Sequence, residues 1–312
     1  MSKKILISDK VHDCLCAGLT EMGFEVDYSP KMSYQDVKDK AGDYQALIIN
    51  SKVICDRAFL DRVTHLEFIG RLGSGLDIID LPYAKKVGIK IISSPEGNAH
   101  AVGEHALGML IMLLQKMYPA YDLLRQGKWI REAHRGTELN NKKIGIIGYG
   151  HTGLAFAQKL SGLNVHILVY DKYKEVRDDK VSPVSLSTLL NESDVVSIHL
   201  PLTDETRYMV DEKFLQSMKR GSIIINTSRG WILKSSALLD ALESQHLSGA
   251  CLDVLENEQP HTWSPEEEHI YSTLLRRDDV VATPHVAGWT HRSLQLIAEV
   301  LLRKITKYYE TH

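Results

Sequence analysis

The chain has 312 residues, of which 44% are hydrophobic and 25% are charged, and its formal net charge is −3. This length provides for about two domains, and the lack of a basic block argues against a nucleic-acid partner. The opening residues carry a polar Asp9 where the apolar core of a secretory signal would continue, and the longest apolar stretch, 106–114, is too short to cross a bilayer. We therefore expect a cytoplasmic protein without membrane or nucleic-acid partners.

Short apolar runs alternate with helical patterns along the chain, which is typical of α/β folds with parallel sheets. Expected strands of a first set cover 5–8, 26–28, 46–50, 68–73 and 90–93. A helix is expected over 99–117, followed by a polar arm over 125–143. Expected strands of a second set cover 143–149, 165–171, 194–200, 222–228, 250–255 and 279–285.

A final helix, expected over 289–309, has apolar residues at helical spacing. Because it follows the last strand of the second set, we expect it to pack back on the first set. The chain would then form two domains, one discontinuous over 1–97 and 287–312 and one continuous over 98–286. The four cysteines, at 14, 16, 55 and 251, have no spacing typical of a metal site, so we expect free thiols and no metal.

A glycine-rich turn connects the strand at 143–149 to a helical pattern. It reads Gly148-Tyr149-Gly150-His151-Thr152-Gly153, which is GxGxxG in the strand–turn–helix context that indicates dinucleotide binding. The first glycine permits the turn, the second lets a pyrophosphate approach the main chain, and the third lets helix and strand pack closely. The free amides at the start of the helix would face the anion.

The next strand ends in Asp171. A carboxylate there can accept hydrogen bonds from both ribose hydroxyls of an adenosine and would repel a 2′-phosphate. We therefore expect NAD rather than NADP, although Lys172 and Lys174 could each pair with such a phosphate.

Polar residues follow successive strands of the second set, and ligands bind beyond the carboxyl ends of parallel strands. Three of these residue types suit oxidation of a 2-hydroxy acid. His285 can act as the base, Glu258 would favour the imidazolium and orient the ring, and Arg229 offers a forked cation to a carboxylate. Taken singly, each of the three could be structural; together with the glycine turn they favour a catalytic role.

Seven segments distributed over nearly the whole chain carry a family resemblance: RLGSGLDIID (71–80), GEHALGML (103–110), GTELNNKKIGIIGYGHTG (136–153), HLPLTDETRYMV (199–210), INTSRG (225–230), GACLDVLENE (249–258) and TPHVAG (283–288). In these segments the chain resembles the D-isomer-specific 2-hydroxyacid dehydrogenases. The resemblance implies a flavodoxin-like substrate domain and a Rossmann NAD domain, both doubly wound, with an interdomain cleft. It also implies a homodimer built on the NAD domain through the helix from about 99 and the arm around Trp129.

The resemblance assigns roles to individual residues. The implied catalytic set is Arg229, Glu258 and His285. The implied cofactor-binding set is Gly148, Gly150, His151, Thr152, Gly153, Asp171, His199, Pro201, Thr227, Ser228, Asp253 and Gly288. The implied substrate-binding set is Asn50, Arg71, Ser74, Gly75, Arg229 and His285, with the backbone amides of Ser74 and Gly75 on the substrate carboxylate.

Within the family the chain is most similar to short-form D-3-phosphoglycerate dehydrogenases, which implies action on 3-phosphoglycerate in serine biosynthesis. Asn50 stands where that subgroup usually has an arginine for the phosphate, and whether Lys52 compensates is open. Gln259 and Trp231 also depart from the common pattern. Alternatives are a glyoxylate or hydroxypyruvate reductase, a D-lactate dehydrogenase, an erythronate-4-phosphate dehydrogenase or, from another class, an NAD(H)-sensing corepressor-like binding protein.

Overall fold

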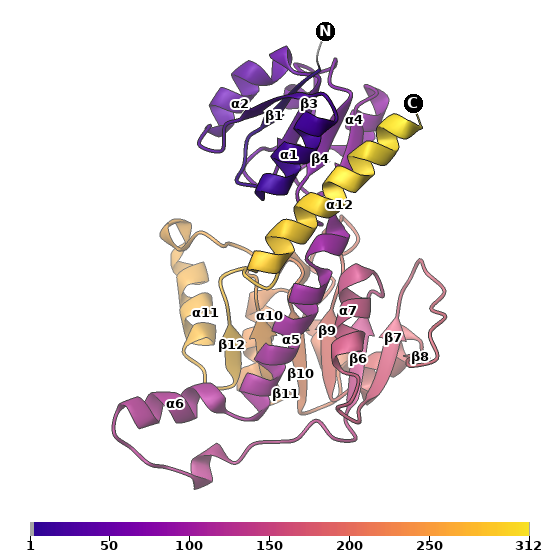
Figure 1. Ribbon diagram of the computed structural model, residues 1–312. Coiled ribbons are helices and arrows are strands. Elements are labelled where there is room, and N and C mark those ends of the chain that lie inside the picture. The colour runs from indigo at the N-terminus through magenta and orange to yellow at the C-terminus, as the bar shows by residue number, and fades with distance from the viewer. Residues whose placement is uncertain (1–2, 312) are drawn as a thin grey trace. The chain divides into compact units, whose positions relative to one another are not determined.

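The computed structural model describes residues 3–311 and divides the chain into two compact units (Figure 1). Unit 1 consists of the chain up to Ala99 together with the segment from Trp289 onward, and unit 2 is His100–Gly288. Across 3–311, every helix is too short or too polar to span a bilayer.

Unit 1 contains a five-stranded parallel sheet in the order β2-β1-β3-β4-β5, which is the flavodoxin-like order. The strands are β1 (Lys4–Ile7), β2 (Glu25–Tyr28), β3 (Ala46–Ile49), β4 (Phe68–Arg71) and β5 (Lys90–Ser93). Side chains alternate between the faces of the sheet, so Ile5 and Ile7 of β1 join one core cluster and Leu6 joins the other.

Helices cover both faces of this sheet. They are α1 (Asp13–Glu21), α2 (Tyr34–Lys40), α3 (Arg57–Leu60), α4 (Leu81–Lys86) and α12 (His291–Glu310), with short 3-10 helices at Ala41–Asp43 and Pro95–Gly97. Leu15 of α1 and Leu301 of α12 share one cluster, whereas Val37 of α2 and Phe59 of α3 belong to the cluster on the other face. The final helix therefore packs on the first sheet.

Unit 2 contains a seven-stranded parallel sheet in the order β12-β11-β10-β9-β6-β7-β8. The strands are β6 (Lys143–Ile147), β7 (His166–Tyr170), β8 (Ser182–Pro183), β9 (Val195–Ile198), β10 (Ser222–Asn226), β11 (Leu247–Leu252) and β12 (Val280–Ala282). The order runs outward in both directions from β6, as in a Rossmann sheet, so the topological switch point lies between β6 and β9.

Helices also cover both faces of the second sheet. They are α5 (Ala99–Leu114), α6 (Met117–Arg125), α7 (His151–Lys159), α8 (Leu186–Glu192), α9 (Glu212–Ser217), α10 (Ser235–Glu243) and α11 (Pro265–Leu275), with 3-10 helices at Glu132–His134, Gly230–Ile232 and Pro260–Thr262. Leu110 of α5 and Phe156 of α7 share one core cluster, and Leu189 of α8, Phe214 of α9 and Leu238 of α10 share the other.

The expected α/β fold of two doubly wound parallel-sheet domains is confirmed. The helix expected over 99–117 ends earlier, at Leu114, because Lys116 adopts a left-handed conformation with φ of 49° and α6 begins after it. The strand expected over 143–149 ends at Ile147, since Gly148 turns the chain with φ of 89°.

Candidate cofactor site and acid–base pair

The glycine turn lies at the switch point of the second sheet. A Cβ on Gly148 would lie 2.3 Å from the His199 carbonyl oxygen, and one on Gly153 would lie 2.0 Å from the Gly148 carbonyl oxygen. These two positions therefore need glycine for the turn and for close packing. A Cβ on Gly150 would meet no described atom within 4 Å, so the space beside this residue is open.

Gly150 is also the N-cap of α7, and no side chain described in the structure caps this end of the helix. The amides of His151 and Thr152 stand in its first turn, where no intrahelical acceptor exists for them. His151 is exposed and Thr152 is half-buried. The open space at Gly150 therefore faces uncapped amides and the positive end of the helix dipole, which fits a pyrophosphate.

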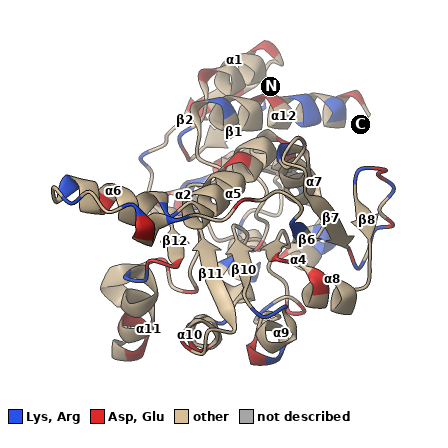
Figure 2. Cartoon of the chain, turned by 90° about the horizontal axis from the view of Figure 1, so that it is seen from below, with Lys and Arg blue, Asp and Glu red and all other residues tan. Residues whose placement is uncertain are grey.

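The Asp171 carboxylate, at the end of β7, is fixed by main-chain amides. Its Oδ2 accepts a hydrogen bond from the Tyr149 amide at 2.8 Å, and its Oδ1 accepts from the amides of Tyr173 and Lys174, each at 3.0 Å. A carboxylate has about four acceptor positions, so one is left for a ribose hydroxyl. The segment between β7 and β8 that follows Asp171 contains both acidic and basic residues (Figure 2).

The imidazole of His199, just after β9, belongs to the core. Its Nε2 lies 2.8 Å from the Ser197 hydroxyl, its ring centroid lies 5.4 Å from that of Phe156, and burial lowers its pKa to about 3. The ring is therefore neutral at physiological pH. Its Nδ1 is buried and has no hydrogen-bond partner among residues 3–311, whereas its main-chain amide donates to the Ile147 carbonyl at 2.8 Å and its carbonyl lies against Gly148. Pro201 is exposed, and its carbonyl accepts a hydrogen bond from Thr206.

The turn after β10 presents Thr227, Ser228 and Arg229. The buried Asn226 side chain shapes it by accepting from the Ser228 amide and donating to the Arg229 carbonyl, both at 3.0 Å. The Ser228 hydroxyl donates to the Ile198 carbonyl at 2.7 Å. The Thr227 Oγ1 is buried and has no hydrogen-bond partner among residues 3–311. A hydroxyl in this state at a strand end fits a polar ligand.

Asp253, after β11, holds the turn that carries His285. Its carboxylate accepts hydrogen bonds from the Thr283 hydroxyl at 2.6 Å and from the amides of Val286 and Ala287 at 2.9 and 2.8 Å. His105 of α5 supports this arrangement, because its Nε2 lies 2.9 Å from the Thr283 hydroxyl. Gly288 is half-buried at the end of the same segment.

The backbone of His285 is in the left-handed region, with φ of 54°. Its amide donates to the Asp253 carbonyl at 2.7 Å and to the Thr283 carbonyl at 3.0 Å, which holds this conformation. A non-glycine residue pays about 1–3 kcal/mol for such a backbone, and this strain is typical of functional positions.

His285 and Glu258 form a hydrogen-bonded pair. The His285 Nδ1 lies 2.9 Å from the Glu258 Oε2, and the two side chains are 44% and 43% exposed. The hydrogen bond from Glu258 raises the pKa of His285 above its ordinary value, while partial burial and the positive charge of Arg229 act in the opposite direction. The structure thus brings the three expected catalytic residues into one electrostatic neighbourhood. The Arg229 guanidinium also donates to the Ser228 carbonyl at 2.7 Å.

The expected substrate residues of unit 1 lie at the carboxyl ends of β3 and β4, where Arg71 is the last residue of β4. Arg71 is only 8% exposed, and its Nη1 donates to the Asn50 Oδ1 at 2.9 Å. The Asn50 amide in turn donates to the Asp9 carboxylate at 2.8 Å. In the loop after β4, Ser74 is exposed and Gly75 is half-buried.

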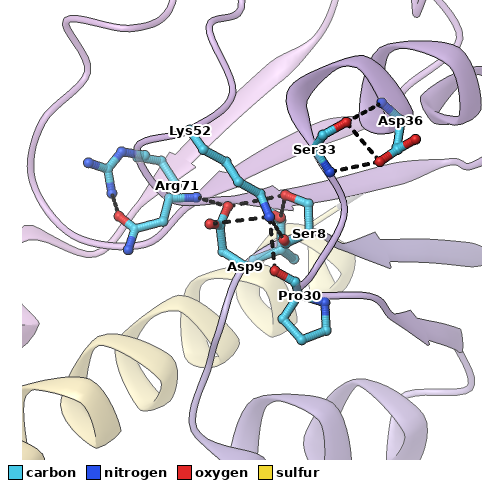
Figure 3. Close-up of polar contacts among 9 residues, drawn as sticks. Ser8, Asp9, Pro30, Ser33, Asp36, Lys52 and Arg71 are labelled. Carbon is cyan, nitrogen blue, oxygen red and sulfur yellow. Dashed lines mark hydrogen bonds and ion pairs between the residues drawn. The ribbon is translucent and has the colours of Figure 1, made fainter.

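Lys52 points toward Ser8, Asp9 and Pro30 (Figure 3). Its Nζ donates to the Ser8 carbonyl and, at 3.1 Å, to the Pro30 carbonyl, and it lies 3.8 Å from the Asp9 carboxylate. These contacts join the loops after β1, β2 and β3, so the ammonium serves the structure of the loops. The same view shows the Ser33–Asp36 capping box at the start of α2.

Two residues that position this site were not identified from the sequence. His105 stands inside the GEHALGML stretch, and Asn226 is the last residue of an otherwise apolar strand. A buried polar residue at the carboxyl end of a core strand was the available signal for Asn226. Open space at Gly150, uncapped amides and a partnerless hydroxyl at Thr227 together fit a dinucleotide, so the fold and the site define a dinucleotide-binding α/β protein with an acid–base pair.

Comparison with known proteins identifies the family within this class. Residues 107–287 match the family described as D-isomer specific 2-hydroxyacid dehydrogenase, NAD binding domain. The D-3-phosphoglycerate dehydrogenase of Archaeoglobus fulgidus is 30% identical over 305 residues, which is 97% of this chain and 56% of that protein. The hydroxypyruvate reductase of Thermotoga maritima is 35% identical over 265 residues, or 85% of each chain. The crystal structure of the D-lactate dehydrogenase from Aquifex aeolicus, complexed with NAD and lactic acid, matches with a TM-score of 0.83 at 27% identity, covering 99% of this chain and 96% of that one.

The chain belongs to the D-isomer specific 2-hydroxyacid dehydrogenase family. It spans about half the length of the phosphoglycerate dehydrogenases that it resembles.

Proposed function

We propose that this chain is an NAD-dependent oxidoreductase that interconverts a D-2-hydroxy acid and the corresponding 2-keto acid. The observation that carries the proposal is the His285–Glu258 pair, with Nδ1 and Oε2 2.9 Å apart, in the same unit as the glycine turn. Such a pair supplies the proton transfer that oxidation of an alcohol needs, and the turn supplies the place for a hydride acceptor.

The residues that would hold NAD line the carboxyl ends of the second sheet. The amides of His151 and Thr152, with Gly148, Gly150 and Gly153, would bind the pyrophosphate, and Asp171 the adenosine ribose. The proposed contacts nearer the nicotinamide come from six residues: Thr227, Ser228, Asp253, Gly288, His199 and Pro201. When bound, NAD accepts the hydride from carbon 2 of the acid, or returns it from the reduced form.

His285 handles the proton. Because Glu258 occupies Nδ1, the ring donates its Nδ1 hydrogen to the carboxylate and keeps the lone pair on Nε2. Nε2 takes the hydroxyl proton as the hydride leaves carbon 2, and the proton then passes to solvent. In the reverse direction the imidazolium gives this proton to the keto oxygen. Arg229 would bind the substrate carboxylate and stabilise the changing charge on the oxygen.

For the substrate, we propose that the amides of Ser74 and Gly75 bind the carboxylate and that Asn50 and Arg71 lie at the other substituent. Because the Lys52 ammonium is bonded to loop carbonyls, it does not replace the arginine that phosphoglycerate dehydrogenases usually have where this chain has Asn50. This observation favours an unphosphorylated acid, such as hydroxypyruvate or glyoxylate, over 3-phosphohydroxypyruvate.

We also propose that the active form is a cytoplasmic homodimer. No residue of α6 is buried, and exposed apolar side chains gather along this helix and the arm after it: Met117, Tyr118, Tyr121, Leu124, Trp129 and Ile130. A patch of this kind is typical of a protein–protein interface. Analytical ultracentrifugation of the wild type and of a Tyr121→Ser, Trp129→Ser variant tests this, and a wild-type monomer would refute it.

The test of the activity is NADH oxidation with a panel of 2-keto acids: 3-phosphohydroxypyruvate, hydroxypyruvate, glyoxylate and pyruvate. We expect turnover with at least one of them and the highest kcat/KM with an unphosphorylated acid. If the protein bound NADH but turned over no 2-keto acid, the proposed dehydrogenase activity would be refuted and the alternative of an NAD(H)-sensing binding protein would be favoured.

A further inference from the structure

Two lysines follow Asp171 within three residues. Lys172 and Lys174 stand directly beside the carboxylate that would contact the adenosine ribose. An ammonium group near a ribose 2′ position pairs readily with a 2′-phosphate, so these two lysines alone would favour NADP.

In the structure, both lysines form hydrogen bonds with groups of the protein. The Lys172 ammonium donates to the Glu205 Oε1, and the Tyr173 hydroxyl donates to the Glu205 Oε2. The Lys174 ammonium donates to the Tyr149 carbonyl at 3.2 Å. One carboxylate therefore ties down two consecutive side chains of the segment after β7.

Glu205 is presented by a well-formed turn in the segment between β9 and α9. The Thr203 amide donates to the Thr206 Oγ1 at 2.9 Å, the Thr206 amide donates to the Thr203 Oγ1 at 3.2 Å, and the Thr206 hydroxyl donates to the Pro201 carbonyl at 2.7 Å. These reciprocal bonds fix the backbone on both sides of Glu205. Its contact with Lys172 thus joins two loops at the carboxyl edge of the sheet.

Four charged groups take part in or adjoin the Lys172–Glu205 contact, and their charges cancel. Asp171 and Glu205 are negative and Lys172 and Lys174 are positive, and three amides hold the Asp171 charge in place. A phosphate dianion added beside Asp171 would meet no surplus of positive charge. Without the Glu205 charge, the remaining three of these groups would carry one surplus positive charge, and Lys172 would be released from its partner.

We propose that Glu205 is a positioning residue for cofactor choice, which excludes NADPH by holding Lys172 away from the ribose 2′ position. The inference rests on the proposed cofactor site and adds to Asp171 a second determinant on a different loop. Glu205 acts through Lys172 and touches neither the substrate nor the reacting atoms.

The test is calorimetric binding of NADH and NADPH, without substrate, to the wild type and to Glu205→Gln. Because both groups of the pair are exposed, the effect should be small: we expect the variant to bind NADPH about fivefold more tightly, with the Kd for NADH within about twofold of wild type. The gain should shrink at high salt, since the groups are exposed.

Two further variants separate positioning from a general charge effect. Glu192→Gln removes a carboxylate from an exposed pair with Lys143, whose atoms are 2.7 Å apart, at the start of β6, and should leave both Kd values unchanged. Lys172→Gln combined with Glu205→Gln should abolish the gain in NADPH binding.

An unchanged ratio of the two Kd values in Glu205→Gln would overturn the inference alone, as would an equal gain in Glu192→Gln or a gain that persists in the double variant. A wild type that binds neither dinucleotide would overturn the proposed function and this inference with it.

Discussion

The substitution Gly150→Ala tests whether the open space at the start of α7 is the binding site of the cofactor's pyrophosphate. The new Cβ would meet no described atom within 4 Å, and φ of −83° suits any residue. As a poorer N-cap than glycine, alanine lowers the free energy of unfolding by up to about 1 kcal/mol. It also lowers the conformational entropy of the unfolded chain, which raises the free energy of unfolding by about 0.4–1 kcal/mol. Because these effects oppose each other, we expect the Tm without ligand to stay within about 2 °C of wild type.

Binding should respond differently. A methyl group placed where a pyrophosphate must approach costs about 1–3 kcal/mol, as overpacking does elsewhere. The Kd for NADH should therefore rise by about fivefold to 150-fold, measured by titration calorimetry.

Gly148→Ala provides the contrast. There φ is 89° and the Cβ would lie 2.3 Å from the His199 carbonyl oxygen, so the free protein itself is strained. A cost of about 1–3 kcal/mol corresponds to a Tm lower by about 2–12 °C in scanning calorimetry. If Gly150→Ala kept the wild-type Kd, or lost as much thermal stability as Gly148→Ala, the space at Gly150 would not be the pyrophosphate site.

Three further predictions concern the acid–base pair and the ribose contact. His285→Ala and Arg229→Ala should each lower kcat/KM by at least about a hundredfold while NADH still binds by calorimetry; unchanged turnover would remove that residue from the mechanism. Keto-acid reduction uses the imidazolium and should fall as pH rises through the pKa of His285, which Glu258 raises. In Glu258→Gln this fall should move to lower pH in a kcat/KM profile, and a profile that stays in place would show that Glu258 does not set the protonation of the ring. Asp171→Ala should narrow the ratio of the Kd values for NADPH and NADH; a constant ratio would mean that another group reads the ribose.

The sequence predicted the two parallel sheets because buried strands are apolar on both faces, as in IIIN of β10, and because every run is followed by a helical pattern. It did not predict the break at Lys116, since lysine has no local signal for a left-handed backbone. The two-residue strand β8 was missed as well, because its Ser182 and Pro183 carry no apolar pattern.

For the candidate site, the sequence predicted which residue types would be present better than it predicted the contacts between them. The position of Gly150, Asp171 and His285 after the expected strands at 143–149, 165–171 and 279–285 indicated one edge of the sheet. Local spacing gave no indication that Glu205 would contact Lys172 or that Lys52 would bind loop carbonyls, because those contacts join loops far apart in the sequence. The roles of all these residues stay predictions until the variants are measured.

The last helix has a consequence for how the chain folds as it is synthesised. Ala298, Leu301 and Ile305 of α12 complete the core cluster around Leu15 of α1. The residues of unit 2 all leave the ribosome before α12 does, so the second sheet can close its core while one face of the first sheet is covered by α1 and still lacks α12. Unit 1, although begun first, is completed after unit 2, and the apolar surface of its sheet that α12 later covers is aggregation-prone until then.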